Sequence, residues 1–395
     1  MTAFTIASFN VKNLIGPDRE YYKWERYTGE EAAWKQDWLS DQLLGMDADI
    51  VGFQEIFEED ALQAVVAMTN AKGEELNETS QPNPRARYAR KMIFRKLKFE
   101  PYPEGGLAFL PNIHDTGEPG RRRPGLAILS RHPFIEPPVA IQDISDDPVE
   151  MRFAQLGGGE AGSYRLESLS RPLVRAEIDV GGQAITVFNL HLKSKLGEFE
   201  SGHDGAPERN LLDYDPVGRA IGEARALMRR TCEAVAVRRL VVRELDAGNP
   251  VVVLGDFNDG EHAVSSAVIA GERPFKNYAW LRRHDAKRPN QRYTDQENEQ
   301  IQEAVSSKRL ISAEALHTRK SLRDMIYTSA FGGVYESIDQ ILLSRHFQPD
   351  YAGADFTLDY LQVFNDHLTD GSFEEAPYNK LASDHGQLVA TIRPR

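Results

Sequence analysis

The sequence has little cysteine: Cys232 is the only one in 395 residues, so the chain cannot form an internal disulfide bond. Cys232 stands among apolar residues at helical spacing, and we interpret it as a core residue rather than a catalytic thiol. Apolar runs long enough to span a bilayer are missing, and so is the basic-then-apolar segment typical of a signal peptide. We therefore expect a cytoplasmic protein without stable membrane association.

The sequence also has fewer basic than acidic residues, which gives a formal net charge of −13. Polyanions prefer a basic surface, so this charge argues against a protein that binds nucleic acid by bulk electrostatics. A local basic track stays open, since residues 85–98 are rich in lysine and arginine with aromatic residues between them. Such a segment suits either a nucleic-acid strand or a solvated helix face.

Several catalytic motifs are missing from the sequence. It has no Gly-rich phosphate loop and no Gly-x-Ser-x-Gly nucleophile motif, which argues against a kinase, an NTPase or an α/β-hydrolase. It also has no closely spaced cysteine pair and no His-x-x-x-His spacing, so a zinc site is disfavoured.

The chain does contain short apolar strands that alternate with helical patterns. Residues 251–254 are apolar throughout and lead into polar Asp256 and Asn258, as expected of a buried strand whose end lies at the rim of a sheet. Similar patterns predict strands over residues 4–11, 49–55, 125–130, 173–180, 184–192, 337–344 and 387–392.

Helical periodicity predicts helices over residues 31–45, 58–68 and 219–245, with Gly45 and Gly248 as stops. A polar loop is expected to begin at residue 70. Two tryptophans of the first helix, Trp34 and Trp38, are expected in the core. Three histidines elsewhere in the chain have no evident role and are expected at the surface: His203, His262 and His317.

Strands and helices alternate in both halves of the chain without a linker between the halves. We therefore interpret residues 1–395 as one α/β domain, and a split near residues 135–170 is the less favoured alternative. Polar segments too long for simple connections predict insertions near residues 70–124, 142–170, 197–216 and 260–330.

Polar residues stand at the ends of the predicted strands. Carboxylates gathered in one pocket repel one another, and they stay ionised at low cost when a cation joins them. Carboxylate and amide oxygens suit Mg²⁺, for which Mn²⁺ can substitute. The pattern predicts metal-assisted hydrolysis with water as the nucleophile. The residues concerned are Asn10, Glu55, His191, Asp256, Asn258, Asp339, Asp384 and His385.

This motif series resembles that of the endonuclease/exonuclease/phosphatase family, which has the DNase I-like fold. The resemblance runs through SFNVKNL, DIVGFQEI, NLHLKSK, GDFND, SIDQILLS and SDHGQ, in the family's order and over nearly the whole chain. It implies a four-layer α/β sandwich, with two mixed sheets packed face to face and helices outside. It also implies hydrolysis of phosphoesters with a divalent metal, usually Mg²⁺.

The resemblance also implies a role for each motif residue. Glu55 is expected to be the direct metal ligand, Asp384 to hold the metal or its water, and Asn10 to orient one of these or contact the phosphate. Asp256 is expected to position and deprotonate the attacking water, and Asn258 to hydrogen-bond the charge that develops on the phosphate.

The histidines complete the expected site. His385, held in one tautomer by Asp339, would grip a non-bridging phosphate oxygen, and its carboxylate partner favours the protonated ring. His191 would face the phosphate or protonate the leaving oxygen. The alternatives are structural: Asp339 can bond to buried backbone, and Asn10 can cap a turn.

One position departs from the family pattern. Several members have an Asp two residues after the first Asn, as a further metal ligand, and here that residue is Lys12. Lys12 is either a phosphate contact or a solvated side chain. Lys193 and Lys195, in the run that resembles bacterial nucleases, are expected to hold neighbouring backbone phosphates.

The substrate is expected to be a nucleic acid, DNA or RNA, which makes the protein a nuclease. The alternative is a small phosphorylated metabolite or a lipid headgroup, although no apolar hairpin that would insert into a membrane is evident, which argues against a sphingomyelinase. An inactive binding protein on the same fold ranks lower, because it predicts loss of catalytic residues that are all present. No protein partner can be inferred.

Overall fold

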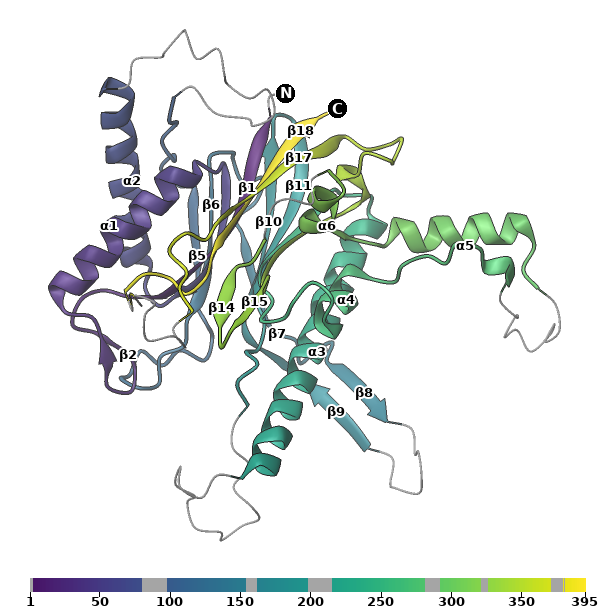
Figure 1. Ribbon diagram of the computed structural model, residues 1–395, viewed down its shortest axis with the longest axis horizontal. Coiled ribbons are helices and arrows are strands. Elements are labelled where there is room, and N and C mark those ends of the chain that lie inside the picture. The colour runs from purple at the N-terminus through teal and green to yellow at the C-terminus, as the bar shows by residue number, and fades with distance from the viewer. Residues whose placement is uncertain are drawn as a thin grey trace.

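Two six-stranded mixed sheets form the centre of the computed structural model, which describes residues 3–79, 98–153, 162–197, 215–280, 292–320, 326–370, 379 and 381–395 (Figure 1). The first sheet contains, in spatial order, β17 (Phe356–Phe364), β18 (Gln387–Pro394), β1 (Phe4–Leu14), β4 (Ile50–Ile56), β6 (Gly125–Ser130) and β5 (Leu107–Leu110). The second contains β13 (Ile311–Ser312), β16 (Asp339–Leu343), β12 (Val251–Asp256), β11 (Gln183–His191), β10 (Ser168–Val180) and β7 (Val139–Asp143).

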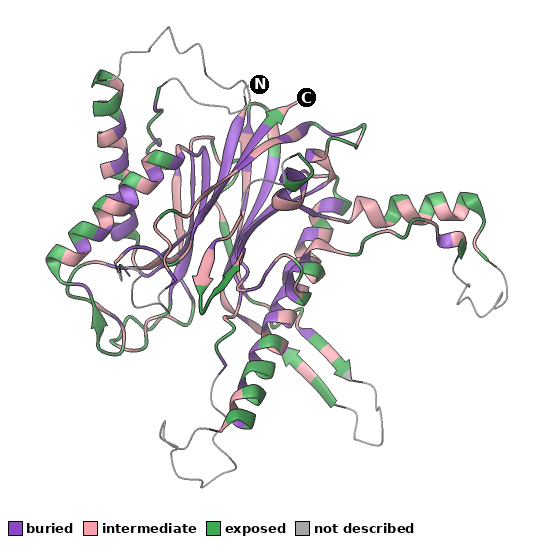
Figure 2. Ribbon diagram, viewed as in Figure 1, coloured by how far each residue is buried: buried purple, intermediate pink, exposed green. Residues whose placement is uncertain are grey.

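The two sheets pack face to face, and helices cover their outer faces (Figures 1 and 2). Side chains alternate across each strand, so Ile6 and Leu254 enter the core between the sheets, whereas Ala7 and Val253 face helices. The first sheet is covered by α1 (Gly29–Met46) and α2 (Glu59–Thr79), and the second by α3 (Pro216–Asp246) and α4 (Val264–Ala270). The predicted four-layer α/β sandwich is confirmed.

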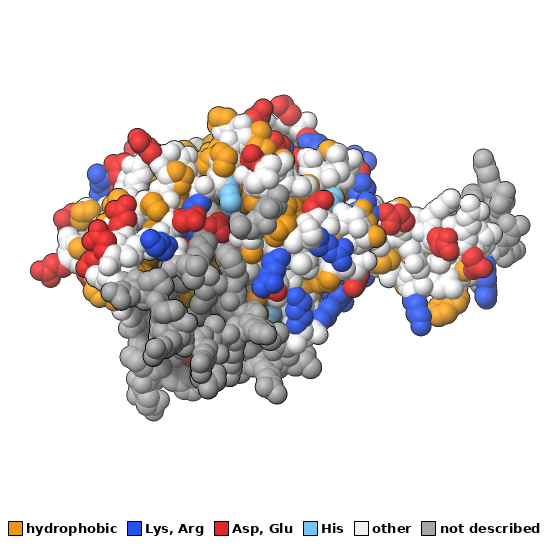
Figure 3. Space-filling view, turned by 90° about the horizontal axis from the view of Figure 1, so that it is seen from above, with side chains coloured by type: hydrophobic (Ala, Val, Ile, Leu, Met, Phe, Trp, Pro, Cys, Tyr) orange, Lys and Arg blue, Asp and Glu red, His pale blue; other side chains and the backbone are white. Residues whose placement is uncertain are grey.

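Smaller elements surround this sandwich, and α5 projects from its body (Figures 1 and 3). On the face shown in Figure 3, acidic and basic side chains of the described residues are interspersed. No helix within the described ranges is long and apolar enough to cross a membrane. The elements are the hairpins β2 (Glu20–Tyr22)–β3 (Glu25–Arg26), β8 (Val149–Phe153)–β9 (Gly162–Leu166) and β14 (Ser329–Phe331)–β15 (Val334–Glu336), the helices α5 (Asp295–Ser307) and α6 (Ala313–Thr318), and the 3₁₀ turns η2 (Tyr278–Trp280) and η3 (Arg345–Phe347).

Each predicted strand is present within one or two residues of its expected bounds, apart from longer ends on β1 and β10. β1 pairs with β18, so the first and last strands lie side by side in one sheet. This pairing supports the proposal that residues 1–395 form one domain. The proposed insertion near residues 142–170 contains the β8–β9 hairpin, and the one near residues 260–330 contains α4, α5 and α6.

Some local expectations were wrong. Gly45 lies inside α1, and Asp47 takes the left-handed conformation that ends it (φ 44°). Residue 70 does not begin a loop, because α2 continues to Thr79. The segment proposed as an insertion near residues 70–124 contributes β5 to the first sheet, and β17 had no sequence prediction at all.

Two side-chain expectations were also wrong. Trp34 is 40% exposed and stacks on Trp38, with 6.3 Å between ring centroids, instead of lying in the core. His317 is buried because α6 packs on β17, where its ring meets Tyr360 edge to face at 4.7 Å. His262 is exposed and Cys232 is buried, as predicted. His203 and most of the basic run 85–98 lie outside the described residues.

A buried polar bridge joins the two sheets near the end of β11. Gln54 Nε2 donates to Asn189 Oδ1 at 2.7 Å, and Asn189 Nδ2 donates to the carbonyls of Phe53 (3.0 Å) and Ala127 (2.9 Å). Gly52 makes room for this contact, because a Cβ there would lie 2.2 Å from Leu254 Cδ1 and 2.8 Å from Asn189 Cγ. The bridge therefore sets how the strand ends of the two sheets face each other.

We expect Asn189→Ala to lower the free energy of unfolding by about 3 kcal/mol or more, since it leaves several buried polar groups without a partner. Urea denaturation monitored by circular dichroism measures this change. Gln63→Ala is the control: Gln63 is exposed and bonds to Glu59, so the expected change is below about 0.5 kcal/mol. Equal stabilities for the two variants would contradict a structural role for the bridge.

Candidate active site

Three polar side chains lie side by side at the ends of neighbouring strands of the second sheet. His191 on β11 is paired with Asp256 on β12, and Asp256 with Asp339 on β16. Each continues the alternation that places the apolar residues of its strand between the sheets, so all three point to the inter-sheet side. They are buried, with Asp256 and Asp339 1% and 0% exposed.

Asn10 on β1 connects these residues to the first sheet. Its Nδ2 donates to Asp256 Oδ2 at 3.0 Å and to Glu55 Oε1 at 3.3 Å, and lies 3.4 Å from His385 Nε2. Its Oδ1 accepts the backbone N–H of Lys12 at 3.0 Å, which fixes the orientation of the amide. Asn10 therefore presents donors to the carboxylates, and this favours its orienting role over direct ligation of a metal.

Glu55 reaches the site because the backbone of β4 is irregular there. Strand alternation would place it on the face opposite Gln54, but the register with β6 shifts between Gln54 and Ile56, and Glu55 has φ 65°. Asn13, also at positive φ (54°), donates its N–H to Glu55 Oε2 at 3.1 Å. Non-glycine residues at positive φ are strained, and such strain is concentrated at functional sites.

His385 stands in the loop before β18 and binds Asp339. Its Nδ1 lies 2.9 Å from Asp339 Oδ2, and its backbone N–H donates to Ser383 Oγ at 3.0 Å. Ser383 Oγ donates to the carbonyl of Asn10 at 2.6 Å, so one hydroxyl holds both the histidine loop and β1. The predicted Asp339–His385 contact is present.

The surroundings shift the pKa values of these groups in opposite directions. Burial raises the pKa of Asp256 to about 7, although the charge of His385 opposes the shift. Burial acts to lower the pKa of His385, but the charges of Asp339 and Asp256 outweigh it and hold the pKa well above its ordinary value. Burial, with the charges of Arg171 and His385, holds the pKa of His191 well below its ordinary value. The site thus contains a charged and a neutral histidine beside a carboxyl group that titrates near neutral pH.

Two groups of side chains in the described part of the chain have ligand atoms within 4.8 Å of one another, close enough to share a metal ion. Asp384 belongs to neither group: its side chain is 53% exposed and lies 3.5 Å from Lys12 Nζ. The groups are Glu55–His191–Asp256 and Asp256–Asp339–His385.

The remaining predicted site residues lie around this cluster. Asn258 donates its backbone N–H to Asp256 Oδ1 at 2.8 Å and its side-chain amide to the carbonyl of Leu192 at 3.0 Å. Lys12 faces Asp384, as described above. Lys193 Nζ donates to Ser194 Oγ (3.3 Å) and to the carbonyl of Leu196 (3.2 Å).

Two cationic residues near the site, Arg171 and Lys35, were not predicted from the sequence. Arg171, at the start of β10, donates to the carbonyl of Leu192 at 3.2 Å and has no carboxylate partner among the described residues. Lys35 on α1 is 1% exposed, and its Nζ donates at 3.0 Å to the carbonyl of Leu381, ahead of the histidine loop. Neither stands at a strand end in the sequence, so the pattern that identified the other residues does not mark them.

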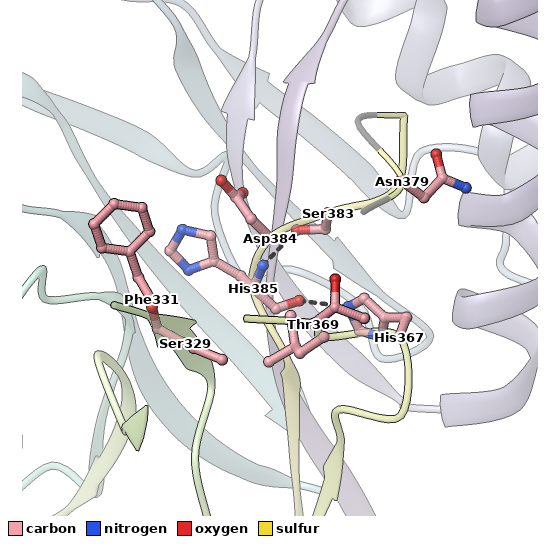
Figure 4. A pocket seen from close by; sticks show the side chains of 10 residues that line it. Ser329, Phe331, His367, Thr369, Asn379, Ser383, Asp384 and His385 are labelled. Carbon is pink, nitrogen blue, oxygen red and sulfur yellow. Dashed lines mark hydrogen bonds between the residues drawn. The ribbon is translucent and has the colours of Figure 1, made fainter. Parts of the chain in front are cut away.

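A pocket of about 440 Å³ opens beside His385 (Figure 4). Figure 4 shows the Phe331 and His385 rings on facing sides of it, and His367 Nε2 lies 2.9 Å from the carbonyl of His385. Phe331 belongs to the β14–β15 hairpin, on which Phe331, Val334 and Tyr335 are 78%, 60% and 52% exposed. The β14–β15 hairpin therefore exposes apolar side chains beside the pocket, and the expectation that the chain has no membrane-inserting apolar hairpin stays a prediction.

Comparison with known proteins agrees with the motif series. A family model described as the endonuclease/exonuclease/phosphatase family matches residues 7–385. A search of curated proteins finds no match. An endonuclease/exonuclease/phosphatase from Beutenbergia cavernae is similar in structure, with a TM-score of 0.47 and 14% identity over 100% of this chain and 72% of that one. The human Nocturnin catalytic domain with a bound sulfate anion (TM-score 0.46, 14% identity, 100% and 95% covered) and truncated Caenorhabditis elegans TDP2 (0.43, 14%, 99% and 97%) are also similar.

The buried lysine makes stability depend on pH. Burial lowers the pKa of Lys35 from 10.5 to about 7, with the charge of Lys12 acting in the same direction and those of Asp384 and Glu55 against it. Between these pH values the unfolded chain keeps a proton that the folded protein has released, so the free energy of unfolding rises with pH. This rise is at most about 1.4 kcal/mol per pH unit.

We expect Lys35→Met to remove this rise, so that the variant is most stable relative to the wild type at pH 6 and loses that advantage toward pH 10. Urea denaturation of both proteins at pH 6, 8 and 10 measures the difference. A difference that stays constant across the range would contradict a lysine that releases its proton near neutral pH.

Proposed function

The chain belongs to the endonuclease/exonuclease/phosphatase family, and on that basis we propose that it is a divalent-metal-dependent phosphodiester hydrolase that acts as a nuclease on DNA or RNA. The observation that carries this proposal is the meeting of acidic groups from both sheets around one amide: Asn10 Nδ2 donates to both Glu55 and Asp256. Such crowding of carboxylates is costly unless a cation binds there during function.

The residues present fit a divalent cation. Asp339 Oδ1 is buried without a hydrogen-bond donor in the described part of the structure, and the carboxylates of Glu55 and Asp256 share the donors of one amide. Mg²⁺ binds through one or two carboxylates and keeps several waters, which suits Glu55, because that side chain is half-buried whereas Asp256 is buried. Asp384 and Asn10 would act on its waters. The ion would supply Lewis-acid stabilisation of the phosphate.

Asp256 is the proposed general base. Its pKa of about 7 gives it a useful ionised fraction and useful basicity at neutral pH, so it can take the proton of an attacking water. The N–H of Asn258 bonds its Oδ1 and holds the carboxylate in one orientation. The amide of Asn258, which donates to Leu192, keeps a second hydrogen for the reacting phosphate.

The two histidines serve different roles in this proposal. His385, kept cationic by Asp339, holds a non-bridging phosphate oxygen by charge and hydrogen bonding. His191 has a low pKa and is neutral at neutral pH, which favours contact with the phosphate over protonation of the leaving oxygen. Arg171, whose guanidinium has no carboxylate partner among the described residues, adds positive charge beside His191.

We expect the protein to cleave a nucleic acid in Mg²⁺ and to lose that activity in EDTA. The assay offers supercoiled plasmid, linear duplex, single-stranded DNA, RNA and a chromogenic phosphodiester, each with Mg²⁺, Mn²⁺ or EDTA. Asp256→Asn should lower kcat by about 10²–10⁴-fold, the contribution of a general base. Asp350→Asn, a substitution of an 85% exposed side chain, is the matched control and should act like the wild type. Full activity of Asp256→Asn would refute the assigned base.

The exposed hairpin favours a second candidate, a phosphodiesterase for lipid headgroups or other small phosphoesters. Phe331, Val334 and Tyr335 present apolar surface next to the pocket at His385, and such a surface can enter the boundary of a bilayer. The same aromatic rings can stack on nucleobases. Hydrolysis of the chromogenic diester without cleavage of any nucleic acid would favour this candidate.

A vesicle assay separates these roles of the hairpin. If the substrate is a lipid, Phe331→Ser should reduce sedimentation with sphingomyelin–phosphatidylcholine vesicles and slow hydrolysis of the embedded diester. For the nuclease we expect no sedimentation of the wild type at physiological salt and a higher KM of Phe331→Ser for single-stranded DNA. Phe275→Ser, at a 52% exposed phenylalanine away from the lining of this pocket, is the control.

A further inference from the structure

A second cleft, of about 780 Å³, lies along α3. Four of its lining side chains are cationic, and none of the described lining residues is Asp or Glu. This local charge contrasts with the net charge of −13 for the whole chain. The cationic residues are Arg123, Lys193, Arg225 and Arg229.

The face of α3 that lines the cleft combines arginines with small residues. Gly222, Arg225, Ala226 and Arg229 all line it and follow helical spacing. Gly197 allows the chain that follows β11 to approach α3 closely, because a Cβ at Gly197 would lie 2.2 Å from the backbone of Gly222. The small side chains leave space between the arginines, so the guanidinium groups of α3 surround the cleft.

A buried carboxylate fixes a wall of this cleft. Glu233, 2% exposed, accepts the N–H of Ser170 at 2.9 Å and that of Lys193 at 2.8 Å. Arg229 Nε lies 3.4 Å from the same carboxylate and donates to Ser170 Oγ at 2.9 Å. The backbone of Lys193 and the guanidinium of Arg229 are therefore held in place before any ligand binds, which lowers the entropy cost of binding.

The chain that leaves β11 links the cleft to the proposed active site. Lys193 follows His191 by two residues on the same strand end. Arg171 donates at 3.2 Å to the carbonyl of Leu192, the residue between His191 and Lys193.

We infer that this cleft binds the phosphates that flank the scissile bond on one side, so that the substrate is an extended polynucleotide chain. Repeated phosphates along a chain need several cations, and the lining of the cleft contains Arg123, Lys193 and Arg225, with Arg171 held at the carbonyl of Leu192 next to Lys193. A mononucleotide or a simple diester would leave the cleft empty. The inference rests on the proposed nuclease function and names its substrate class.

The test compares a single-stranded oligonucleotide with bis(4-nitrophenyl) phosphate, which lacks flanking phosphates. For the double variant Arg123→Gln/Arg225→Gln we expect the ratio of kcat/KM on the oligonucleotide to kcat/KM on the simple diester to fall at least about tenfold, through KM. The slope of log KM against log salt should decrease by about 0.7 for each lost phosphate contact. Both residues lie in exposed positions, so the protein should keep its fold.

The matched control is Arg121→Gln/Arg243→Gln. Arg121 lies on the same loop as Arg123, is 75% exposed and pairs with Glu118, and Arg243 lies on α3 outside the cleft, 64% exposed. We expect the ratio for this control to equal that of the wild type. An unchanged ratio and salt slope for Arg123→Gln/Arg225→Gln would overturn the inference and leave the nuclease proposal standing.

A binding measurement covers failure of the nuclease proposal itself. If the wild type cleaves no oligonucleotide, fluorescence anisotropy of a labelled oligonucleotide with Asp256→Asn in EDTA still tests the cleft. If adding Arg123→Gln and Arg225→Gln to Asp256→Asn weakens oligonucleotide binding at least about tenfold, the result would support phosphate binding by the cleft. It would refute only the nuclease activity. Absence of binding, or binding that the added substitutions do not change, would overturn the inference.

Discussion

The site depends on one amide group that holds carboxylates from two sheets together. Asn10 Nδ2 contacts Glu55 and Asp256, while the N–H of Lys12 fixes the orientation of the amide. Like charges at this separation repel, so the arrangement needs donors, the cationic ring of His385, and a sandwich stiff enough to resist opening. The Gln54–Asn189 bridge and the apolar core between the sheets supply that stiffness directly behind the proposed catalytic residues.

The same burial that stabilises the sandwich sets the chemistry of its rim. Asp256 and His191 stand at the buried ends of their strands, and burial is the largest cause of the pKa shift of each. His385 shifts the other way because Asp339 sits against its ring. Small differences in access to water and in partners thus separate a carboxyl group that titrates near neutral pH, a neutral ring and a cationic ring within one cluster. The cationic lining of the cleft along α3 gives a chain with a net charge of −13 a local surface that we propose attracts phosphates.

Sequence periodicity was reliable where an element is buried on both faces and weak elsewhere. The strands that carry Asn10, His191, Asp256 and Asp339 were predicted, because an apolar run that ends in a polar residue marks the rim of a sheet. β17 alternates weakly and lies at the edge of its sheet, where half-exposed residues blur the pattern. Residue type also misled: Trp34 lies at the surface and His317 is buried, because packing partners rather than residue type decide exposure.

The sequence by itself determined the α/β alternation, the strand ends and the residue types found there, since these follow from local periodicity and the chemistry of each side chain. The tertiary structure alone decided which of them meet. Asn10 and Asp256 are 246 positions apart in the sequence. Glu55 enters the site because its backbone has a positive φ, which no local sequence pattern predicts. Arg171 and Lys35 joined the site for the same reason: distances between remote residues are set by how sheets and helices pack, and that packing is a property of the whole core.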